Sequence, residues 1–170
     1  DNVKKALTSE QLRNLMDAQA TTPEQERARR FFFFSYVSNG MNMKDIALLK
    51  WSQMEADKLT FIRQKTKLTK KGKPQLITVF LTDFHREVLE YHGTDPERSE
   101  YVFPILEGGM DAERQHSTIK NFTRGVNQHL AKLCKANNLQ KVSTYWARHS
   151  FATVAVRKGA SMEFMREALG

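Results

Sequence analysis

The chain has 170 residues and a formal net charge of +8, from 27 basic and 19 acidic side chains. Its length suits one domain with its own core, and 40% hydrophobic with 27% charged residues excludes a disordered chain. The longest apolar run, at 31–34, is far shorter than the roughly 20 residues of a membrane span, while a single cysteine, Cys134, excludes an internal disulfide and is typical of a reducing cytoplasm.

Two helices are predicted before residue 41. Thr8 and Gln11 have the spacing of a capping box, in which two side chains bond backbone N–H groups at a helix start. Thr22 and Gln25 repeat this spacing. Pro23 would be the first helical residue, where a missing N–H costs no hydrogen bond. The second helix should continue through four consecutive phenylalanines, 31–34, and end near Gly40. So dense an aromatic cluster predicts a core.

A pair of strands is predicted after a short helix at Met43–Leu49. The segments Leu59–Gln64 and Gln75–Phe80 are rich in β-branched and aromatic residues, which favour strands. Lys70–Pro74 has turn chemistry, so we expect an antiparallel hairpin. Residues 58–73 carry seven basic side chains and no acidic one. Most of the surplus charge therefore lies on this hairpin, although an isolated run of this kind is usually a solvated loop.

Helices are predicted for most of the remaining chain. One runs from Thr82 to about Tyr91, and a polar connection with glycines and a proline spans 93–109. A long helix then places apolar residues at three-to-four spacing: Ile119, Phe122, Val126, Leu130 and Leu133. The fold class is therefore mainly α with one small antiparallel β-hairpin.

The helix from Thr144 to Arg157 brings polar groups to one face. Residues at i, i+3, i+4 and i+7 lie together on a helix, and here they are Tyr145, Arg148, His149 and Ala152. Such a face suits a phosphate, since helix N–H groups and a guanidinium both bind anions. A surface helix whose arginine packs locally is at least as good an interpretation of the spacing alone.

The opposite side of this helix is expected to face the core. The residues predicted to be buried there are Ala147, Phe151, Val154 and Ala155. Gly159 should end the helix, and Ser161 should cap a last one.

The C-terminal part of the chain resembles the tyrosine recombinase (phage integrase) family. Tyr145–Thr153, followed by Gly159 and Ala168–Gly170, is similar to the family's signature His-x-x-Arg-His-(Ser/Thr)-(Phe/Trp)-Ala-Thr, a later Gly, and Leu-Gly-His. Similar substitutions to those found here are familiar in integrases of Bacteroides-type mobile elements.

Three upstream segments resemble the same family in the correct order. Asn39–Trp51 is similar to its first box, Gly-(Leu/Met)-Arg-x-x-(Glu/Asp)-(Leu/Ile) followed by Leu-x-Trp. Gln64–Lys67 resembles the segment with the family's β-strand lysine, and Ala6–Leu12 resembles the entry into its catalytic domain. Four boxes in register over nearly the whole chain imply the catalytic-domain fold of this family for residues 1–170.

The resemblance implies a DNA breaking and rejoining reaction without a metal or cofactor. A tyrosine of the family attacks a DNA phosphodiester and forms a 3′-phosphotyrosyl link. By resemblance Arg148 clamps the non-bridging oxygens and Lys65 is the general acid for the leaving 5′-oxygen. Asp45 matches the acidic residue that orients the cations, with a helix-capping or surface acid as the alternative interpretation.

Two positions depart from the family pattern. Asn42 stands where the first box has arginine, and amide groups donate hydrogen bonds without charge. Tyr145 stands in the histidine position, and a phenol is a poor base at neutral pH. Loss of one transition-state donor costs on the order of 3 kcal/mol unless another group replaces it. Lys44, or a basic residue outside these boxes, could supply the missing charge.

The family's nucleophilic tyrosine is expected beyond Gly170, so no nucleophile is assigned in this chain. Tyr36, Tyr91 and Tyr101 match no motif and are interpreted as packing residues. We therefore expect a domain that is truncated at its C-terminus, lacks the N-terminal core-binding domain, and is inactive and monomeric by itself. The full-length protein is expected to form a synaptic tetramer.

The implied partner is double-stranded DNA. Residues expected on its backbone are Arg63, Lys67, Lys70, Lys71, Lys73 and His149. Two other classes stay open: a non-catalytic DNA-binding or regulatory module derived from the integrase fold, and, less favoured, an RNA-binding or generic basic helical domain.

Overall fold

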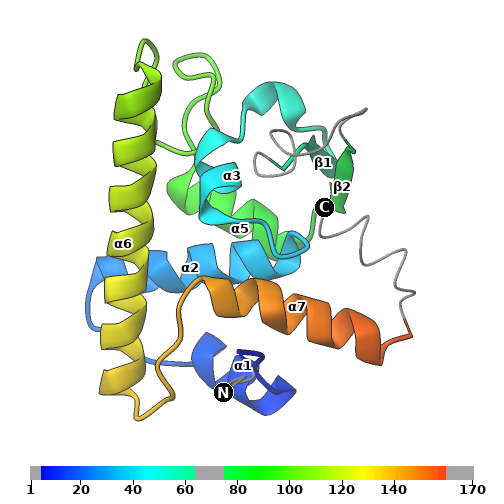
Figure 1. Ribbon diagram of the computed structural model, residues 1–170, viewed down its shortest axis with the longest axis vertical. Coiled ribbons are helices and arrows are strands. Elements are labelled where there is room, and N and C mark those ends of the chain that lie inside the picture. Colours follow the sequence, from blue (N-terminus) through cyan, green and yellow to red (C-terminus); the bar gives the residue numbers. More distant parts are fainter. Residues whose placement is uncertain (1–4, 64–74, 160–170) are drawn as a thin grey trace.

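Helices form most of the molecule, and the computed structural model describes residues 5–63 and 75–159 (Figure 1). The elements are α1 (Ser9–Met16), α2 (Pro23–Val37), α3 (Met43–Leu48), the 3-10 turn η1 (Trp51–Gln53), β1 (Lys58–Phe61), β2 (Ile77–Phe80), α5 (Asp83–His92), α6 (Ala112–Ala136) and α7 (Tyr145–Arg157). Within the described ranges, no helix has the length and apolar character needed to cross a bilayer.

The first two helices begin where the sequence predicts. At α1, the Thr8 hydroxyl accepts a bond from the Gln11 N–H, and the Gln11 side chain accepts one from the Thr8 N–H. At α2, the Thr22 hydroxyl accepts from the Gln25 N–H, the Gln25 side chain accepts from the Thr21 N–H, and a proline lies in the first turn. These caps satisfy N–H groups that have no partner within the helix, which fixes both starts.

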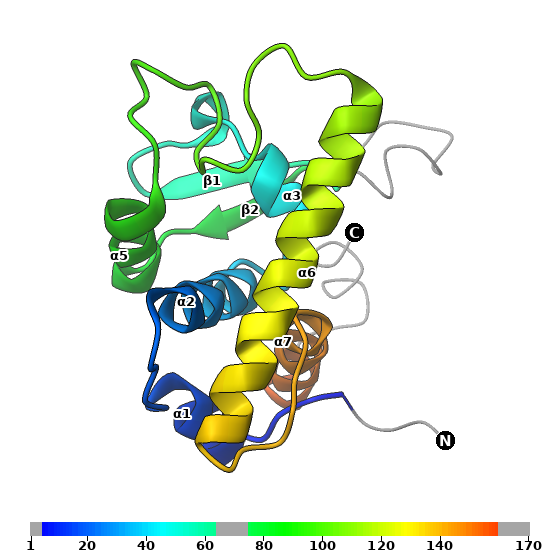
Figure 2. The ribbon, with the colours of Figure 1, turned by 90° about the vertical axis from the view of Figure 1, so that its left-hand side faces the viewer.

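Helix α2 is the centre of the fold. Its four consecutive phenylalanines, 31–34, are all buried, so this turn of the helix is enclosed around its whole circumference. Phe31 and Phe34 belong to a core with α3, α5 and the sheet, whereas Phe32 and Phe33 belong to a second core with α1, α6 and α7. Both views show that α6 crosses α2 and that α7 lies beside α2 (Figures 1 and 2). The predicted aromatic core is confirmed.

The two strands form an antiparallel sheet that lies over α3 and α5. The register pairs Lys58 with Phe80 and Phe61 with Ile77. Leu59, Phe61, Ile77 and Val79 are buried, so alternate residues face the core, as a half-buried sheet requires. Both strands are shorter than predicted, and the rest of the predicted hairpin, residues 64–74, lies outside the described residues.

The connection from 93 to 109 contributes to the core, contrary to the prediction of a merely polar link. Its buried residues are Tyr101, Val102, Phe103, Ile105 and Leu106. The Val102 N–H donates to the Leu49 carbonyl, and Lys50 pairs with Tyr101 in an isolated bridge. These backbone bonds to the segment after α3 allow an irregular chain to be buried without unsatisfied polar groups.

Helix α7 is buried less deeply than predicted. Ala147 and Ser150 are buried, whereas Phe151, Val154 and Ala155 are only half-buried. The Ser150 hydroxyl accepts from the Leu7 N–H at 3.0 Å, which ties the first half of the helix to the N-terminal segment. The later turns extend past α2 (Figure 1), so they have less of the core to cover. The cap predicted at Ser161 lies outside the described residues.

The tyrosines without a motif have different surroundings. Tyr101 is buried and Tyr36 is partly buried in the second core, in agreement with packing roles. Tyr91 is exposed instead, and the Arg30 guanidinium lies over its ring at 4.0 Å. The prediction of a packing role is therefore wrong for Tyr91, because its side chain lies on the exposed side of α5.

Candidate functional site: two arginines on one turn

The turn after α2 is the base of the site. Asn39 and Gly40 both have positive φ, 57° and 69°, which glycine adopts freely and asparagine tolerates. The Gly40 N–H donates to the Ser35 carbonyl at 2.9 Å, and the Ser35 hydroxyl donates to the Met41 carbonyl at 2.6 Å. These bonds close the turn over the end of α2 and leave the Asn39 and Gly40 carbonyls for side chains from elsewhere.

Helix α7 lies directly on this turn. A Cβ atom at Gly40 would be 2.8 Å from the Arg148 Cα and 3.0 Å from its Cγ, closer than real contacts allow. The Arg148 side chain is half-buried, and its Nη1 donates to the Gly40 carbonyl at 3.5 Å. Glycine in the first box is therefore required both by its φ and by the approach of Arg148.

Arg63 reaches the same turn from the end of β1. Its side chain is only 2% exposed, and its Nη2 donates to the Asn39 carbonyl at 3.2 Å. The guanidinium also lies 5.8 Å from the centre of the Phe61 ring. Arg63 was expected to contact the DNA backbone, whereas the structure buries its side chain against this turn. The signal was present in the sequence, since alternation places Arg63 on the same face as Leu59 and Phe61.

Asp45 is the acidic member of the cluster. It lies in the first turn of α3 and is 6% exposed, so the interpretation as a surface acid is wrong. The pKa of Arg63 is lowered to about 10, chiefly by burial and also by the charge of Arg148, while Asp45 opposes both. Burial also lowers the pKa of Arg148, with Tyr145 and Asp45 opposing it. Asp45 thus interacts with both guanidinium groups, and both remain charged at neutral pH.

Tyr145 and His149 form the open side of the site. Tyr145 is 53% exposed, and its ring packs edge-on against His149 with centroids 4.6 Å apart. Lys5 Nζ lies 5.7 Å from the Tyr145 ring. Because both residues share a helix face with Arg148, the predicted grouping of Tyr145, Arg148 and His149 agrees with the structure.

Of the remaining predicted residues, two lie at the start of α3 and five fall outside the described residues. Asn42 caps α3 without a side-chain cap bond and is half-buried, and Lys44 is exposed. Lys65, Lys67, Lys70, Lys71 and Lys73 lie outside the described residues. In the ranges 5–63 and 75–159, no three His, Cys, Asp or Glu side chains are grouped to hold a metal ion.

A basic groove along α6 was not predicted. Its lining residues are Lys120, Thr123, Arg124, Asn127, Gln128, Ala131, Lys132 and Lys141. Lys120, Arg124 and Lys132 recur at multiples of four along α6, so they form one ridge. They do not stand out in the charge pattern, because nine acidic residues offset them in the stretch 74–139, all of them before residue 114. The groove continues to the start of α7, where Asn127 accepts a hydrogen bond from the Thr144 N–H at 2.9 Å.

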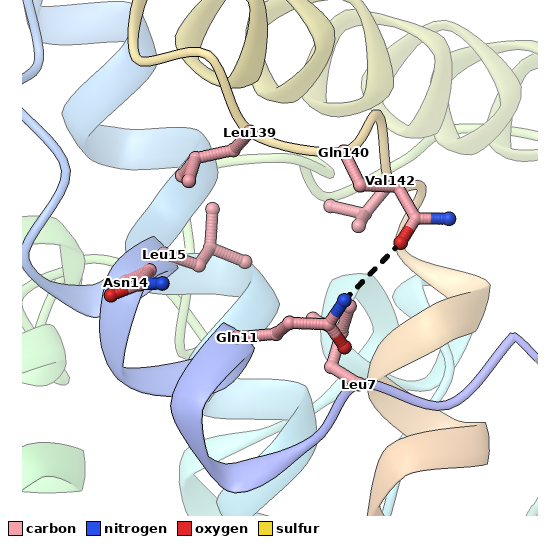
Figure 3. A pocket seen from close by; sticks show the side chains of 7 residues that line it. All are labelled: Leu7, Gln11, Asn14, Leu15, Leu139, Gln140 and Val142. Carbon is pink, nitrogen blue, oxygen red and sulfur yellow. Dashed lines mark hydrogen bonds between the residues drawn. The ribbon is translucent and has the colours of Figure 1, made fainter.

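A second cavity, between α1 and the segment before α7, is no ligand site. Its volume is about 40 Å³, against roughly 300–1,000 Å³ for small-molecule sites. Figure 3 shows its mostly apolar lining and the bond from Gln11 Nε2 to Gln140 Oε1, 3.5 Å long. This space is a packing gap beside α1.

Comparisons with known proteins agree with this geometry. Residues 5–170 match the Phage integrase family. Among solved structures, XerA recombinase aligns with a TM-score of 0.56 at 15% identity. The alignment covers 96% of this chain and 55% of the XerA chain. XerH recombinase bound to palindromic difH substrate, in a post-cleavage complex, aligns with a TM-score of 0.63 at 16% identity. The alignment covers 99% of this chain and 47% of the XerH chain. A pre-cleavage complex of XerH with difH gives a TM-score of 0.62 at 15% identity, covering 99% and 48%.

The solved structures that match are longer than this chain. The chain spans about half the length of the solved recombinases that it matches. No curated protein has significant similarity to it. The described helices and the two-stranded antiparallel sheet have the tyrosine recombinase catalytic-domain fold. A family match over residues 5–170 shows that the chain belongs to the phage integrase family.

Proposed function

We propose that this chain is the catalytic domain of a DNA integrase or site-specific recombinase that cleaves and rejoins DNA through a 3′-phosphotyrosyl intermediate. The observation that carries the proposal is the half-buried Arg148 guanidinium, held against the Gly40 turn beside the buried Asp45. A cation fixed at the edge of a low-dielectric site is suited to a phosphodiester, because charge develops on its oxygens during transfer.

The described side chains have distinct roles in this reaction. Arg148 binds the non-bridging oxygens of the scissile phosphate, and Asp45 keeps the guanidinium oriented through its charge. Tyr145 occupies the family's histidine position, where its exposed hydroxyl donates a hydrogen bond to the phosphate. His149, whose ring packs against Tyr145 on the same helix face, contacts the DNA backbone next to the scissile phosphate.

The bond changes follow from the family chemistry. A tyrosine oxygen forms a bond to phosphorus, the bond from phosphorus to the 5′-oxygen breaks, and that oxygen receives a proton. We assign the proton donor to Lys65 on its match to the β-strand lysine. The covalent intermediate conserves the phosphoester, so that a second 5′-hydroxyl reseals the strand.

The DNA partner is supported by the charge pattern of the described surface. The ridge formed by Lys120, Arg124 and Lys132 provides phosphate contacts along α6, at the end nearest to α7. The XerH structures are complexes with difH substrate, and we propose duplex DNA for this chain as well. Contacts of this kind position a protein without reading sequence. In the full-length protein we propose a synaptic tetramer.

Trapping on nicked DNA tests the reaction. The full-length protein is incubated with nicked duplexes that carry its recombination site, and covalent adducts are separated by denaturing electrophoresis. We expect Arg148→Gln to reduce adduct formation by on the order of 100-fold or more, as for loss of one transition-state donor. The matched control is Arg98→Gln, because the Arg98 side chain is 88% exposed and pairs only across a loop with Asp95. Equal adduct yields from wild type and Arg148→Gln would contradict the assignment.

The second candidate is a non-catalytic DNA-binding module of the same fold. Asn42 and Tyr145, at two family positions, favour it, because neither supplies the cation or the base of the usual pattern. Salt-dependent DNA binding without any adduct would support this module, whereas an adduct excludes it.

A further inference from the structure

We propose that Lys5 is a further DNA-binding residue, which holds a backbone phosphate of the cleaved strand next to the scissile phosphate. This inference rests on the proposed function. Lys5 lies outside the basic run at 58–73 and outside the segments that match the family's cationic residues. The fold brings it to α7 from the other end of the chain.

The segment that carries Lys5 is fixed against α7. The Leu7 side chain is buried in the second core, and the Leu7 N–H donates to the Ser150 hydroxyl at 3.0 Å. The Ser150 hydroxyl in turn donates to the Trp146 carbonyl at 2.6 Å, so α7 itself sets its orientation. The capping box at Thr8 then starts α1. Because Leu7 is anchored by its side chain and its N–H, Lys5, two residues earlier, begins beside α7 (Figure 2).

Two contacts of α7 leave its open face between them. Ser150 meets the N-terminal segment on one side of the helix, and Arg148 meets the turn after α2 on another. Because an α-helix turns by about 100° per residue, these two side chains point about 200° apart. Tyr145 and His149, both exposed, lie in the arc between them, whereas Ala147 lies in the opposite arc and is buried. The open face is therefore bordered by Arg148 and by the segment of Lys5.

Lys5 reaches the open face from the side of Ser150. Its Nζ lies 5.7 Å from the centre of the Tyr145 ring, within the range of a cation–π contact. Such a contact is weak at an exposed site, so it keeps the ammonium near Tyr145 and leaves its N–H donors for a phosphate. In the described part of the chain, no carboxylate lies within ion-pair distance of Lys5. A DNA strand that passes from Arg148 over Tyr145 therefore presents its next phosphate to Lys5.

A solvated lysine is the competing explanation, and the salt dependence of DNA binding separates the two. Binding of the full-length protein to duplexes that carry its recombination site is measured by fluorescence anisotropy. Each phosphate contact contributes about 0.9 to the slope of log K against log salt, because it releases a counterion. We expect Lys5→Gln to reduce the slope by this amount and to weaken binding about five- to tenfold at 0.1 M salt. Lys5→Arg keeps the charge and should keep the slope.

Neutral methylphosphonate linkages locate the phosphate. One linkage at a time replaces either of the two phosphates that flank the scissile one in the cleaved strand. If Lys5 binds the replaced phosphate, the linkage and Lys5→Gln remove the same contact, and their effects on affinity do not add. We expect such coupling at one flanking position, where wild type loses about five- to tenfold in affinity and Lys5→Gln loses little more. The matched control is Arg98→Gln, which removes an exposed charge in the connection 93–109 and should bind each duplex as wild type does.

The outcomes separate this inference from the proposed function. If Lys5→Gln keeps the wild-type slope, Lys5 is a solvated lysine and the inference is overturned. Additive effects at both flanking positions overturn it as well, because Lys5 then binds no phosphate next to the scissile one. In either case, a covalent adduct that is lost in Arg148→Gln leaves the proposed function intact. A wild type that neither binds the duplex nor forms an adduct overturns both proposals.

Discussion

Two buried polar clusters lie on either side of the turn after α2, and they differ in charge. In the first, His85 is fully buried, its Nδ1 accepts from the Thr82 N–H, and its Nε2 lies 2.9 Å from the Ser38 hydroxyl. Burial is the main reason that the pKa of His85 falls to about 4. The imidazole is therefore neutral at pH 7, and both ring nitrogens have hydrogen-bond partners.

The second cluster begins one residue later and is charged. Arg63 and Arg148 donate to carbonyls of the Asn39–Gly40 turn, Asp45 attracts both guanidiniums, and Arg148 is partly open to solvent. A neutral, fully bonded cluster stabilises a fold at little electrostatic cost, whereas buried charges are costly unless they are paired. The first cluster joins α2 to α5, and we propose that the second binds an anion at Arg148.

The largest effect is expected from Gly40→Ala, which attacks the charged cluster at its base. The left-handed backbone and the clash of a Cβ with Arg148 should together lower the free energy of unfolding by about 3–4 kcal/mol. Urea unfolding measures the loss. The rise in melting temperature (Tm) that inorganic phosphate gives over chloride at equal ionic strength, called here the phosphate effect, should disappear with it. Gly93→Ala is the matched control, since a Cβ there would lie 2.4 Å from the Leu89 carbonyl oxygen, away from both arginines. It should lose stability but keep the phosphate effect, and loss of the effect in both variants would contradict the prediction.

Acid should weaken the neutral cluster first. The unfolded chain binds a proton on histidine near pH 6.5, whereas folded His85 does so only near pH 4. The contribution of His85 to the free energy of unfolding is therefore fully present above about pH 6.5. It decreases by about 3 kcal/mol as the pH falls to 4. His92, whose pKa is also lowered to about 4, chiefly by burial, adds to the decrease. Urea unfolding between pH 7 and 4.5 measures it.

The contribution of His85 is isolated by a variant that cannot titrate. His85→Gln should be less stable than wild type at pH 7, because it loses the bonds to Thr82 and Ser38. Its stability should change less between pH 7 and 4.5, and a pH dependence equal to that of wild type would show that His85 is not the titrating group.

A smaller effect is expected in the α6 groove, where charges are exposed rather than clustered. Arg124→Gln should reduce the slope of log K against log salt by about 0.9 and weaken duplex binding by about 1 kcal/mol at 0.1 M salt. Fluorescence anisotropy over a salt series measures both. Arg98→Gln should leave the slope unchanged, and the same slope for both variants would remove the groove from the DNA interface.

The smallest expected effect is a gain of stability. A Cβ at Gly125, within α6, would meet no atom within 4 Å. Gly125→Ala should therefore raise the free energy of unfolding by about 0.5–1 kcal/mol, because alanine is the better helix former. Thermal unfolding in chloride tests this, and the phosphate effect should stay that of wild type.

Local rules were sufficient to predict the helix starts, the aromatic core and the sheet. Capping at Thr8 and Thr22 depends only on residues three positions apart. Four consecutive phenylalanines predict burial by their hydrophobicity alone. The core segment 101–106 was missed because it is irregular, and its burial depends on bonds to the distant Leu49 and Lys50.

The candidate site was predicted in part for the same reason. The shared face of Tyr145, Arg148 and His149 follows from helical spacing within α7. Arg63 was misplaced because its charge was considered together with the lysines that follow it, and the alternation of β1 was not extended to it. Arg63, just after β1, and Arg148, in α7, reach the same turn, and this tertiary relation is encoded by neither segment alone.

The most direct test of the central claim, that the charged cluster binds a phosphate, is a crystal structure with tungstate. This tetrahedral oxyanion is located by its anomalous scattering, independently of any DNA sequence. We predict a tungstate ion within hydrogen-bond distance of the Arg148 guanidinium, on the side of Tyr145 and absent from crystals of Arg148→Met. Tungstate at the α6 groove alone, with none at Arg148, would contradict the account.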